Sequence, residues 1–256
     1  MTGRRAHWLV VVAALTAGVV LACGGGDSRS STQSPGTQSP TASPSPTPVP
    51  TPGPNASPLE KLAAGYLQGV NGKVVYRYLG INWGEHPDGT WTVYRDGEKR
   101  REDWTNQAAG LPATTIAIHR EDGNYICTDA QVLKQCYAQQ EKDLQLVFVL
   151  FTPVHEVFEA ILRGIEGLQV TELPPETIAG VSAECFDLNV PGRIGVGPPG
   201  TEKIKTCFSQ EGALLYLKRT VTFKNPDQPV AELTAEAQEV GPTAPSDFEP
   251  IVPPQS

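Results

Sequence analysis

The sequence is short of basic residues, histidine and long apolar runs, and each shortage argues against a class of protein. Twenty lysines and arginines stand against 28 aspartates and glutamates, which gives the 256-residue chain a formal charge of −8. Nucleic-acid binders, and proteins that dock on anionic lipid through a polybasic patch, need a basic face. The uncharged run over residues 8–22 is shorter than a typical membrane-spanning helix.

Sequence motifs for catalysis are also missing. The chain has no nucleophile elbow, no P-loop and no dinucleotide fingerprint, and its Gly/Pro-rich loop at residues 192–200 lacks the Lys-Ser/Thr that would hold phosphate and metal. Of the four histidines, His155 lies beside Glu156 and Glu159 on a predicted helix, a pattern more typical of a solvated face than of a metal site. We therefore expect no catalytic residue, no metal and no cofactor, and interpret the chain as a non-enzyme, with an unrecognised hydrolase as the third hypothesis.

The N-terminus has the layout of a secretory signal. Arg4 and Arg5 precede the uncharged run, which stops at Cys23. The sequence Val20-Leu-Ala-Cys23 resembles the bacterial lipoprotein cleavage box, in which the cysteine is acylated and becomes the first residue. Residues 1–22 are thus predicted to be a signal peptide and Cys23 the lipid attachment site, carrying palmitate-like chains that each stabilise the anchor by about 0.8 kcal/mol per CH₂. An ordinary secretory signal or an uncleaved anchor is the alternative.

A tether follows over residues 23–58. From residue 27 onward it consists largely of Ser, Thr, Pro, Gln and Gly, and it contains nine of the 24 prolines. Little apolar surface is available to offset the entropy cost of ordering it, so we expect a disordered, polyproline-II-rich linker that reaches at most roughly 100 Å. A proline-rich recognition motif is the alternative. This arrangement predicts a lipid-anchored protein on the extracytoplasmic face of the cell membrane.

The folded domain is predicted over residues 59–241. Ser57-Pro58-Leu-Glu60 is typical of a helix start, with Ser57 as N-cap, Pro58 at the first helical position and Glu60 completing a capping box. A second helix is predicted from Thr152-Pro153 to Gly164. The apolar run at residues 144–151 before it is a strand or a buried helix by periodicity, and the acidic residues that precede it favour a helix.

Elsewhere the apolar period is two, which is typical of strands. The pairs Asp96-Gly97 and Asp122-Gly123 each separate two such segments and are strong hairpin signals. About five strands are predicted before the helical block, from six such segments, and about four after it. The segments lie at residues 73–79, 90–95, 98–104, 114–119, 124–127, 134–138, 178–190, 203–208, 213–223 and 230–240. The order predicts an α+β fold with one large antiparallel sheet, followed by a Pro-rich tail at 242–256 in which Phe248 could tuck back.

Four cysteines besides Cys23 fit disulfides in an extracytoplasmic compartment. Three pairings are possible. Facing positions on antiparallel strands lie within bridging distance, and two pairs of cysteines lie on neighbouring predicted strands across a single loop. We therefore favour Cys127–Cys136 and Cys185–Cys207. A metal site would be expected to contain C-x-x-C or an adjacent His, which is absent, and free buried thiols are the other alternative.

Alternating aromatic and aliphatic residues mark one apolar sheet face, for which few covering helices are predicted. Either the helices fill this face completely and give a plain core, or they leave an apolar pocket. The candidate lining residues are Tyr76, Tyr78, Trp91, Val93, Ile116, Ile118, Phe158, Ile161, Leu215 and Leu217.

The pattern from residue 59 to residue 240 resembles the LolA/LppX-like lipoprotein-carrier superfamily. The matching features are an opening amphipathic helix, Gly72-Lys-Val-Val-Tyr76, the hairpin at residues 91–97, the hairpin Asp122-Gly-Asn-Tyr125, a helical insert and the segment at 180–188. The resemblance implies a curved antiparallel sheet, an incomplete β-barrel, whose concave face is covered by a few helices around a cavity for acyl chains. The cysteines, the long tether and the membrane anchor depart from the soluble shuttle of the family and argue against shuttling between membranes.

Two main functions follow. The first is a membrane-anchored, non-catalytic lipoprotein that binds a lipid or other apolar ligand in the half-barrel. The second is an interaction or sensor domain at the cell envelope whose core is filled. In either case we expect a monomer that contacts the membrane through Cys23 and does not bind nucleic acid.

Overall fold

The computed structural model describes residues 52–53, 55–68, 71–82, 88–108, 111–140, 158, 160–192, 194 and 199–255. All of them belong to the compact unit Pro46–Ser256. The predicted signal peptide, the lipid attachment site at Cys23, most of the tether and the apolar run at 144–151 lie outside the described residues. No helix among the described residues is long and apolar enough to cross a membrane.

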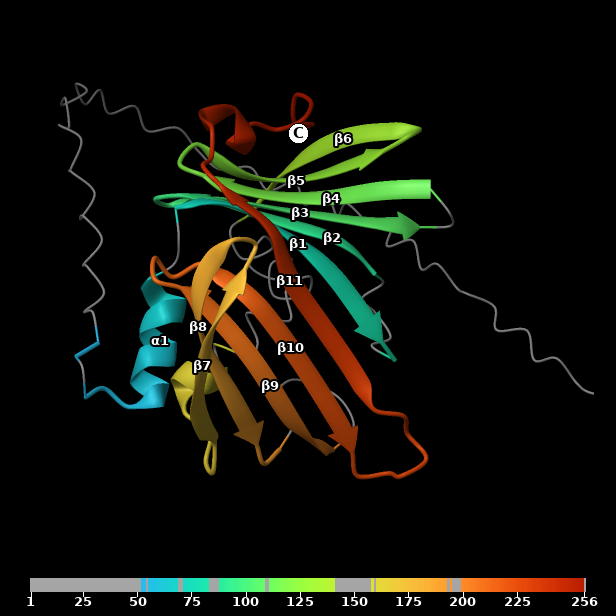
Figure 1. Cartoon of the computed structure of the whole chain (residues 1–256). Helices are drawn as coiled ribbons and strands as arrows, with labels where there is room; N and C mark the ends of the chain where they lie inside the picture. The colour runs from blue at the N-terminus through green and yellow to red at the C-terminus, as the bar shows by residue number, and fades with distance from the viewer. Residues whose placement is uncertain are drawn as a thin grey trace, which may run out of the picture. The chain divides into compact units, whose positions relative to one another are not determined.

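One eleven-stranded antiparallel sheet dominates the described part of the chain (Figure 1). Its spatial order is β6-β5-β4-β3-β2-β1-β11-β10-β9-β8-β7, so two meanders meet where the first and last strands pair. The strands are β1 (Gly72–Ile81), β2 (Gly89–Asp96), β3 (Lys99–Ala108), β4 (Leu111–Arg120), β5 (Gly123–Ala130), β6 (Leu133–Gln139), β7 (Gln169–Ile178), β8 (Val181–Val190), β9 (Gly200–Ser209), β10 (Leu214–Phe223) and β11 (Ala231–Gly241).

The sheet is strongly twisted and not closed (Figure 1), because its two edge strands, β6 and β7, do not pair with each other. In Figure 1 the strands of the β7–β11 half run steeply across those of the β1–β6 half. Within the β7–β11 half the curl is tight enough for β7 to contact β11, four positions away in the sheet. The large antiparallel sheet is therefore as the sequence predicts.

Two-residue turns fix the strand register. The pairs Asp96↔Lys99 and Arg120↔Gly123 close the predicted hairpins, and Gly97 supplies the positive φ of +60° that the first turn requires. The predicted strand at 178–190 is wrong at its start, because Ala179 and Gly180 have φ values of +49° and +78° and form another tight turn.

Strand β7 is the element that the sequence did not predict. Pro174 and Pro175 lie in its middle, and proline in a strand pattern normally argues against a strand because it removes a backbone donor. The register shifts between Leu173 and Glu176, so the two prolines occupy an irregularity in the ladder. The strand also lies at the sheet edge, where a missing donor costs least.

Helices are few. The predicted first helix is α1 (Pro58–Gln68), and its capping box is formed: the Ser57 backbone N–H donates to Glu60 at 2.7 Å and the Glu60 N–H donates to Ser57 Oγ at 3.3 Å. Residues 160–163 and Phe158 are helical, as predicted for the end of the second helix. A short 3₁₀ helix, η1 (Pro245–Phe248), completes the described helices. The expected helical cover of the sheet is thus only partly present among the described residues.

The two sheet faces carry separate cores. Register places Tyr76, Trp91 and Leu217 on one face, which we call the inner face, and it carries most of the larger core. The opposite, outer face of β4–β6 carries a smaller cluster of Ile116, Ile118 and the Cys127–Cys136 disulfide, covered by Ile251 and Val252 of the C-terminal tail.

Candidate functional site

Four aromatic side chains form a continuous strip across the inner face of β1, β2 and β3. We call Tyr76, Tyr78, Trp91 and Trp104 the aromatic strip. The rings of Tyr76 and Trp91 stack with centroids 4.6 Å apart, Trp91 and Trp104 are 5.9 Å apart, and Tyr78 meets Trp104 edge-on at 4.6 Å. The strip arises because Tyr76, Trp91 and Trp104 are directly opposite one another in the register.

Two polar atoms of the strip form hydrogen bonds within the protein. The Tyr76 hydroxyl donates to the Leu214 carbonyl at 2.6 Å, and Trp91 Nε1 donates to Glu102 Oε2 at 3.1 Å. Burial raises the pKa of Tyr76 and of Tyr78, so both phenols stay neutral at all physiological pH values. The strip therefore presents ring surface rather than polar groups to the interior.

The inner face continues from the strip onto β4, β5 and β6 as a stretch without charge, which we call the apolar lane. Its nine side chains are small, apolar or uncharged polar, and most of them are only partly buried. Leu133, at the rim of the lane, is 46% exposed, and Leu111, on the same face at the start of β4, is 49% exposed. The lane comprises Ala113, Thr115, Ala117, Ile126, Thr128, Ala130, Leu133, Gln135 and Tyr137.

A polar row closes one end of the lane. Arg95, Arg100, His119 and Asn124 are successive partners on β2 to β5, with His119 Nδ1 and Asn124 Oδ1 2.6 Å apart. Arg100 pairs with the buried Glu102, whereas Arg95 forms no ion pair with a described residue. Burial, and then the facing charge of Arg100, lower the pKa of Arg95. The inner face is thus amphipathic along its length.

At the other side of the inner face, α1 covers β7 and β9. Tyr66 of α1 stacks on Phe158 at 4.4 Å, and Phe158 meets Phe208 of β9 edge-on at 5.4 Å. A Cβ on Gly65 would come within 3.3 Å of the Phe208 ring, so a glycine here lets the helix approach the sheet closely. The described helical cover therefore lies over β7–β9 and not over the apolar lane.

An ion pair is buried under the same face. The Arg219 side chain is 2% exposed and that of Glu202 is 0% exposed, and both also hold the backbone of Ile194. Arg219 lies two residues from Leu217 and two residues from Val221 on β10, so strand alternation places its side chain on the same, apolar face. The bonds to Ile194 fix part of the Gly/Pro-rich loop against the inner face.

The structure brings most of the predicted lining residues together. Tyr76, Tyr78, Trp91, Phe158, Ile161, Leu215 and Leu217 are buried in the larger core, and Val93 packs against it. Ile116 and Ile118 do not join them: this assignment is wrong, because Thr115 is opposite Trp104 and the two isoleucines therefore point to the outer face. Trp104 belongs to the strip and was missed, although it lies at the same spacing from the Gly97 turn as Trp91.

Both predicted disulfides, Cys127–Cys136 and Cys185–Cys207, are present and each joins directly opposed residues. The one group of potential metal ligands among the described residues is Glu176 with Cys185 and Cys207. Because both sulfurs are in a disulfide, no thiolate is available there to bind a metal.

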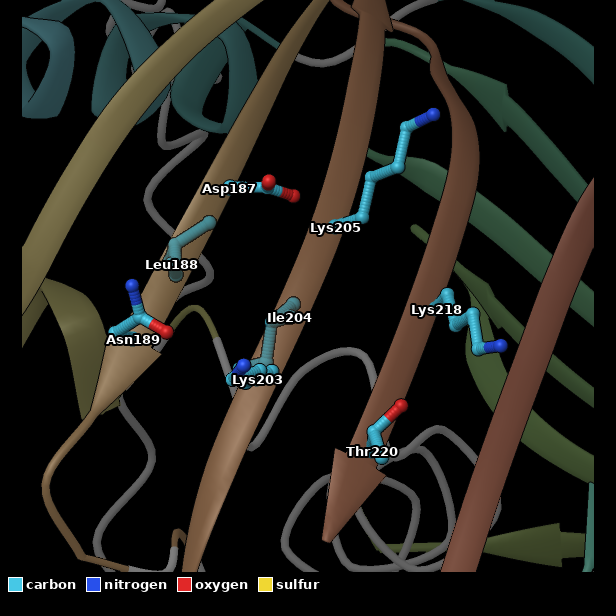
Figure 2. Close-up of a pocket in the computed structure, with 8 residues that line it drawn as sticks. All are labelled: Asp187, Leu188, Asn189, Lys203, Ile204, Lys205, Lys218 and Thr220. Atoms are coloured by element: carbon cyan, nitrogen blue, oxygen red, sulfur yellow. The ribbon is translucent and has the colours of Figure 1, made fainter.

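A cavity of about 240 Å³ lies on the outer face of β8, β9 and β10 (Figure 2). It is a polar site, distinct from the inner face. Its lining residues are Asp187, Leu188, Asn189, Lys203, Ile204, Lys205, Lys218 and Thr220.

Comparison with known proteins finds structural neighbours. No protein-family model matches the chain, and no curated protein sequence matches it. The structural neighbours include one bacterial lipoprotein, MucB and a putative lipoprotein-sorting domain.

Three of these neighbours show how far the likeness extends. The lipoprotein LppX of Mycobacterium tuberculosis is similar with a TM-score of 0.39 and 10% identity, over 72% of this chain and 96% of LppX. MucB is similar with a TM-score of 0.34 and 12% identity, over 75% of this chain and 61% of MucB. A putative outer membrane lipoprotein-sorting protein domain of Vibrio parahaemolyticus gives 0.18 and 10%, over 75% of this chain and 95% of that domain.

Proposed function

We propose that the protein binds a lipid or other apolar ligand along the inner face of its sheet and does no chemistry on it. The observation that carries this proposal is the apolar lane, an uncharged, partly exposed surface that continues a buried aromatic strip. Transfer of apolar surface out of water contributes about 25 cal/mol per Å², or about 0.8 kcal/mol per CH₂. An acyl chain that lies along the lane would therefore gain several kcal/mol with no further specific contact.

The polar row supports an amphiphile rather than a plain hydrocarbon. Arg95 and Arg100 lie directly opposite each other at one end of the lane, and like charges that face each other on adjacent strands are unfavourable without a counter-charge. An anionic or strongly polar headgroup beside Arg95 would relieve this repulsion while the chain lies on the lane. The ligand class that fits is a lipid with its headgroup at the β2–β3 hairpin.

The location belongs to the same proposal. Acylation at Cys23 would anchor the domain through the Pro-rich tether to the extracytoplasmic face of the cell membrane, so that the lane works within reach of the bilayer. The two disulfides support an oxidising compartment.

An interaction or sensor domain with a filled core is the second candidate. It is favoured by the near-complete burial of the aromatic strip, since Trp91 and Trp104 are only 3% and 5% exposed. The two functions differ in whether an apolar ligand occupies the lane.

Native mass spectrometry and organic extraction of the purified protein distinguish the lipid-binding function from the filled-core domain. We expect a bound lipid in the wild-type protein and its loss in Ala130→Lys, which places an ammonium in the lane. Val132→Lys, in the adjacent turn where Val132 is 90% exposed, is the matched control and should retain the lipid. Lipid-free wild-type protein, or equal lipid in both variants, would favour the filled-core domain.

A further inference from the structure

The outer cavity is framed by two rows of side chains that cross three neighbouring strands. One row is Asp187, Lys205 and Lys218, and the other is Asn189, Lys203 and Thr220, in each case as direct partners on β8, β9 and β10. Figure 2 shows the two rows on either side of the hollow, and the residues between them, Leu188 and Ile204, belong to the buried core. We call this site the outer hollow.

The lining of the outer hollow holds three lysines. Lys205 and Lys218 are directly opposite each other, an arrangement that is destabilising unless anions lie beside the two ammonium groups. Glu176 and Glu232, outside the lining, supply carboxylates for these two lysines, so Lys203 is the lysine of the hollow without an ion pair among the described residues.

Ion pairs within the protein engage two of the three lysines. Lys205 pairs with Glu176 of β7 at 2.6 Å, and Lys218 pairs with Glu232 of β11 at 3.3 Å. Lys203 forms no ion pair with any residue that the structure describes.

We propose that the outer hollow binds a phosphate ester that also carries a hydroxyl group. Lysine ammonium groups are common phosphate ligands, and the Asn189 amide adds a neutral donor at the same level as Lys203. The Thr220 hydroxyl donates to Glu232 at 3.4 Å, which leaves its oxygen to accept from a ligand hydroxyl. Asp187 accepts hydrogen bonds only, so it suits a ligand hydroxyl and disfavours a bare phosphate. The volume is below that of sites for drug-sized ligands and fits a small polar group.

Glycerol phosphate is the soluble probe of this site. We expect isothermal titration calorimetry of the full chain at low salt to show saturable binding, weakened by added salt. Lys203→Gln should weaken binding about tenfold, as expected for the loss of one charge-assisted contact, without unfolding the protein, because Lys203 holds no ion pair within the described structure. Lys224→Gln removes the same charge at an exposed position just after β10 and should leave the affinity unchanged.

Asp187→Asn separates phosphate-ester recognition from general charge attraction. The substitution removes a repulsive carboxylate, so inorganic phosphate should bind more tightly, whereas the preference for glycerol phosphate over inorganic phosphate should shrink. No binding of glycerol phosphate to the wild-type chain, or equal loss in Lys203→Gln and Lys224→Gln, would overturn the proposal.

Vesicles identify the source of the phosphate ester. In a Cys23→Ser chain, which cannot be acylated at that residue, flotation with phosphatidylglycerol vesicles that is lost in Lys203→Gln would assign the site to a lipid headgroup. Binding of glycerol phosphate without such Lys203-dependent flotation would assign it to a soluble ester. Lipid extraction tests the proposed function independently of this site, because Lys203→Gln should leave the amount of lipid bound at the inner face unchanged.

Discussion

Arg219 and Glu202 form a buried, bidentate ion pair, in which Arg219 Nε lies 2.9 Å from Glu202 Oε2 and Nη2 lies 3.0 Å from Oε1. Arg219 also donates to the Ile194 carbonyl at 2.6 Å, and the Ile194 N–H donates to Glu202 Oε1 at 3.0 Å. The pair therefore joins β9, β10 and the loop that ends at β9, and it places a satisfied polar network within an apolar face.

Removing one member of this pair should be costly. In Arg219→Met the Glu202 carboxylate stays buried without its counter-charge, so urea unfolding should show a loss of about 3–5 kcal/mol in the free energy of unfolding. The double variant Glu202→Leu/Arg219→Met should recover most of this loss. Lys224→Gln, which is exposed, should change little. A single variant as stable as the wild type would mean that the pair is not buried as described.

The C-terminal tail should act as part of the fold. Phe248 is 2% exposed, Arg101 Nη1 donates to the Asp247 carbonyl at 2.8 Å, and the Gln255 N–H donates to the Cys136 carbonyl at 2.8 Å. Phe248→Ala should cost about 3 kcal/mol and speed hydrogen exchange in β4–β6. Val132→Ala, at an exposed turn, is the control. Unchanged exchange in those strands would contradict a structural tail.

The two disulfides should differ in strength. Cys185 and Cys207 are separated by 22 positions in the sequence, whereas Cys127 and Cys136 are separated by 9, so the first disulfide closes the longer loop. By chain entropy the first contributes about 3.5 kcal/mol and the second about 2.5 kcal/mol. Chemical unfolding of the two double-alanine variants measures both losses. A larger loss for the Cys127/Cys136 pair would show that contacts with the tail, rather than loop closure, determine its contribution.

The α1 cap should depend on pH. Hydrogen bonds from the backbone N–H and then the hydroxyl of Ser57 lower the pKa of Glu60. Because the folded-state pKa lies below the unfolded one, the ionised carboxylate stabilises the fold above the unfolded pKa, and this contribution is lost as the pH falls through the folded pKa. The midpoint temperature of thermal unfolding should therefore fall less between pH 7 and pH 3 for Glu60→Gln than for the wild type. Glu211→Gln, in an exposed turn, should follow the wild type.

Local sequence signals predicted the elements whose structure is set by nearby residues. The capping box at Ser57, the two-residue turn at Gly97 and the opposed cysteines depend on residues close in sequence, and all are present. Strand β7 was missed because two prolines mask the pattern, and they are tolerated because the strand lies at the sheet edge and its register shifts at the prolines.

The face of a strand was harder to predict than its existence. Alternation shows that Ile116 and Ile118 share a face, but it does not say which face of the sheet that is. The answer depends on the register between β3 and β4, in which Ala108 pairs with Leu111 and Thr115 therefore lies opposite Trp104. The Arg219–Glu202 pair was missed. Arg219 lies at the alternate position between the apolar Leu217 and Val221, but a charged residue in a strand usually indicates a side chain that faces solvent.

Quenching of tryptophan fluorescence by an acyl chain measures the central claim most directly. In a Trp8→Phe/Trp83→Phe chain the remaining tryptophans are Trp91 and Trp104, both in the aromatic strip next to the apolar lane. A brominated fatty acid should quench this emission saturably, and Ala130→Lys should abolish the effect. Emission that a brominated chain leaves unchanged, at concentrations where the same chain binds the protein, would show that the inner face is not where apolar ligands go.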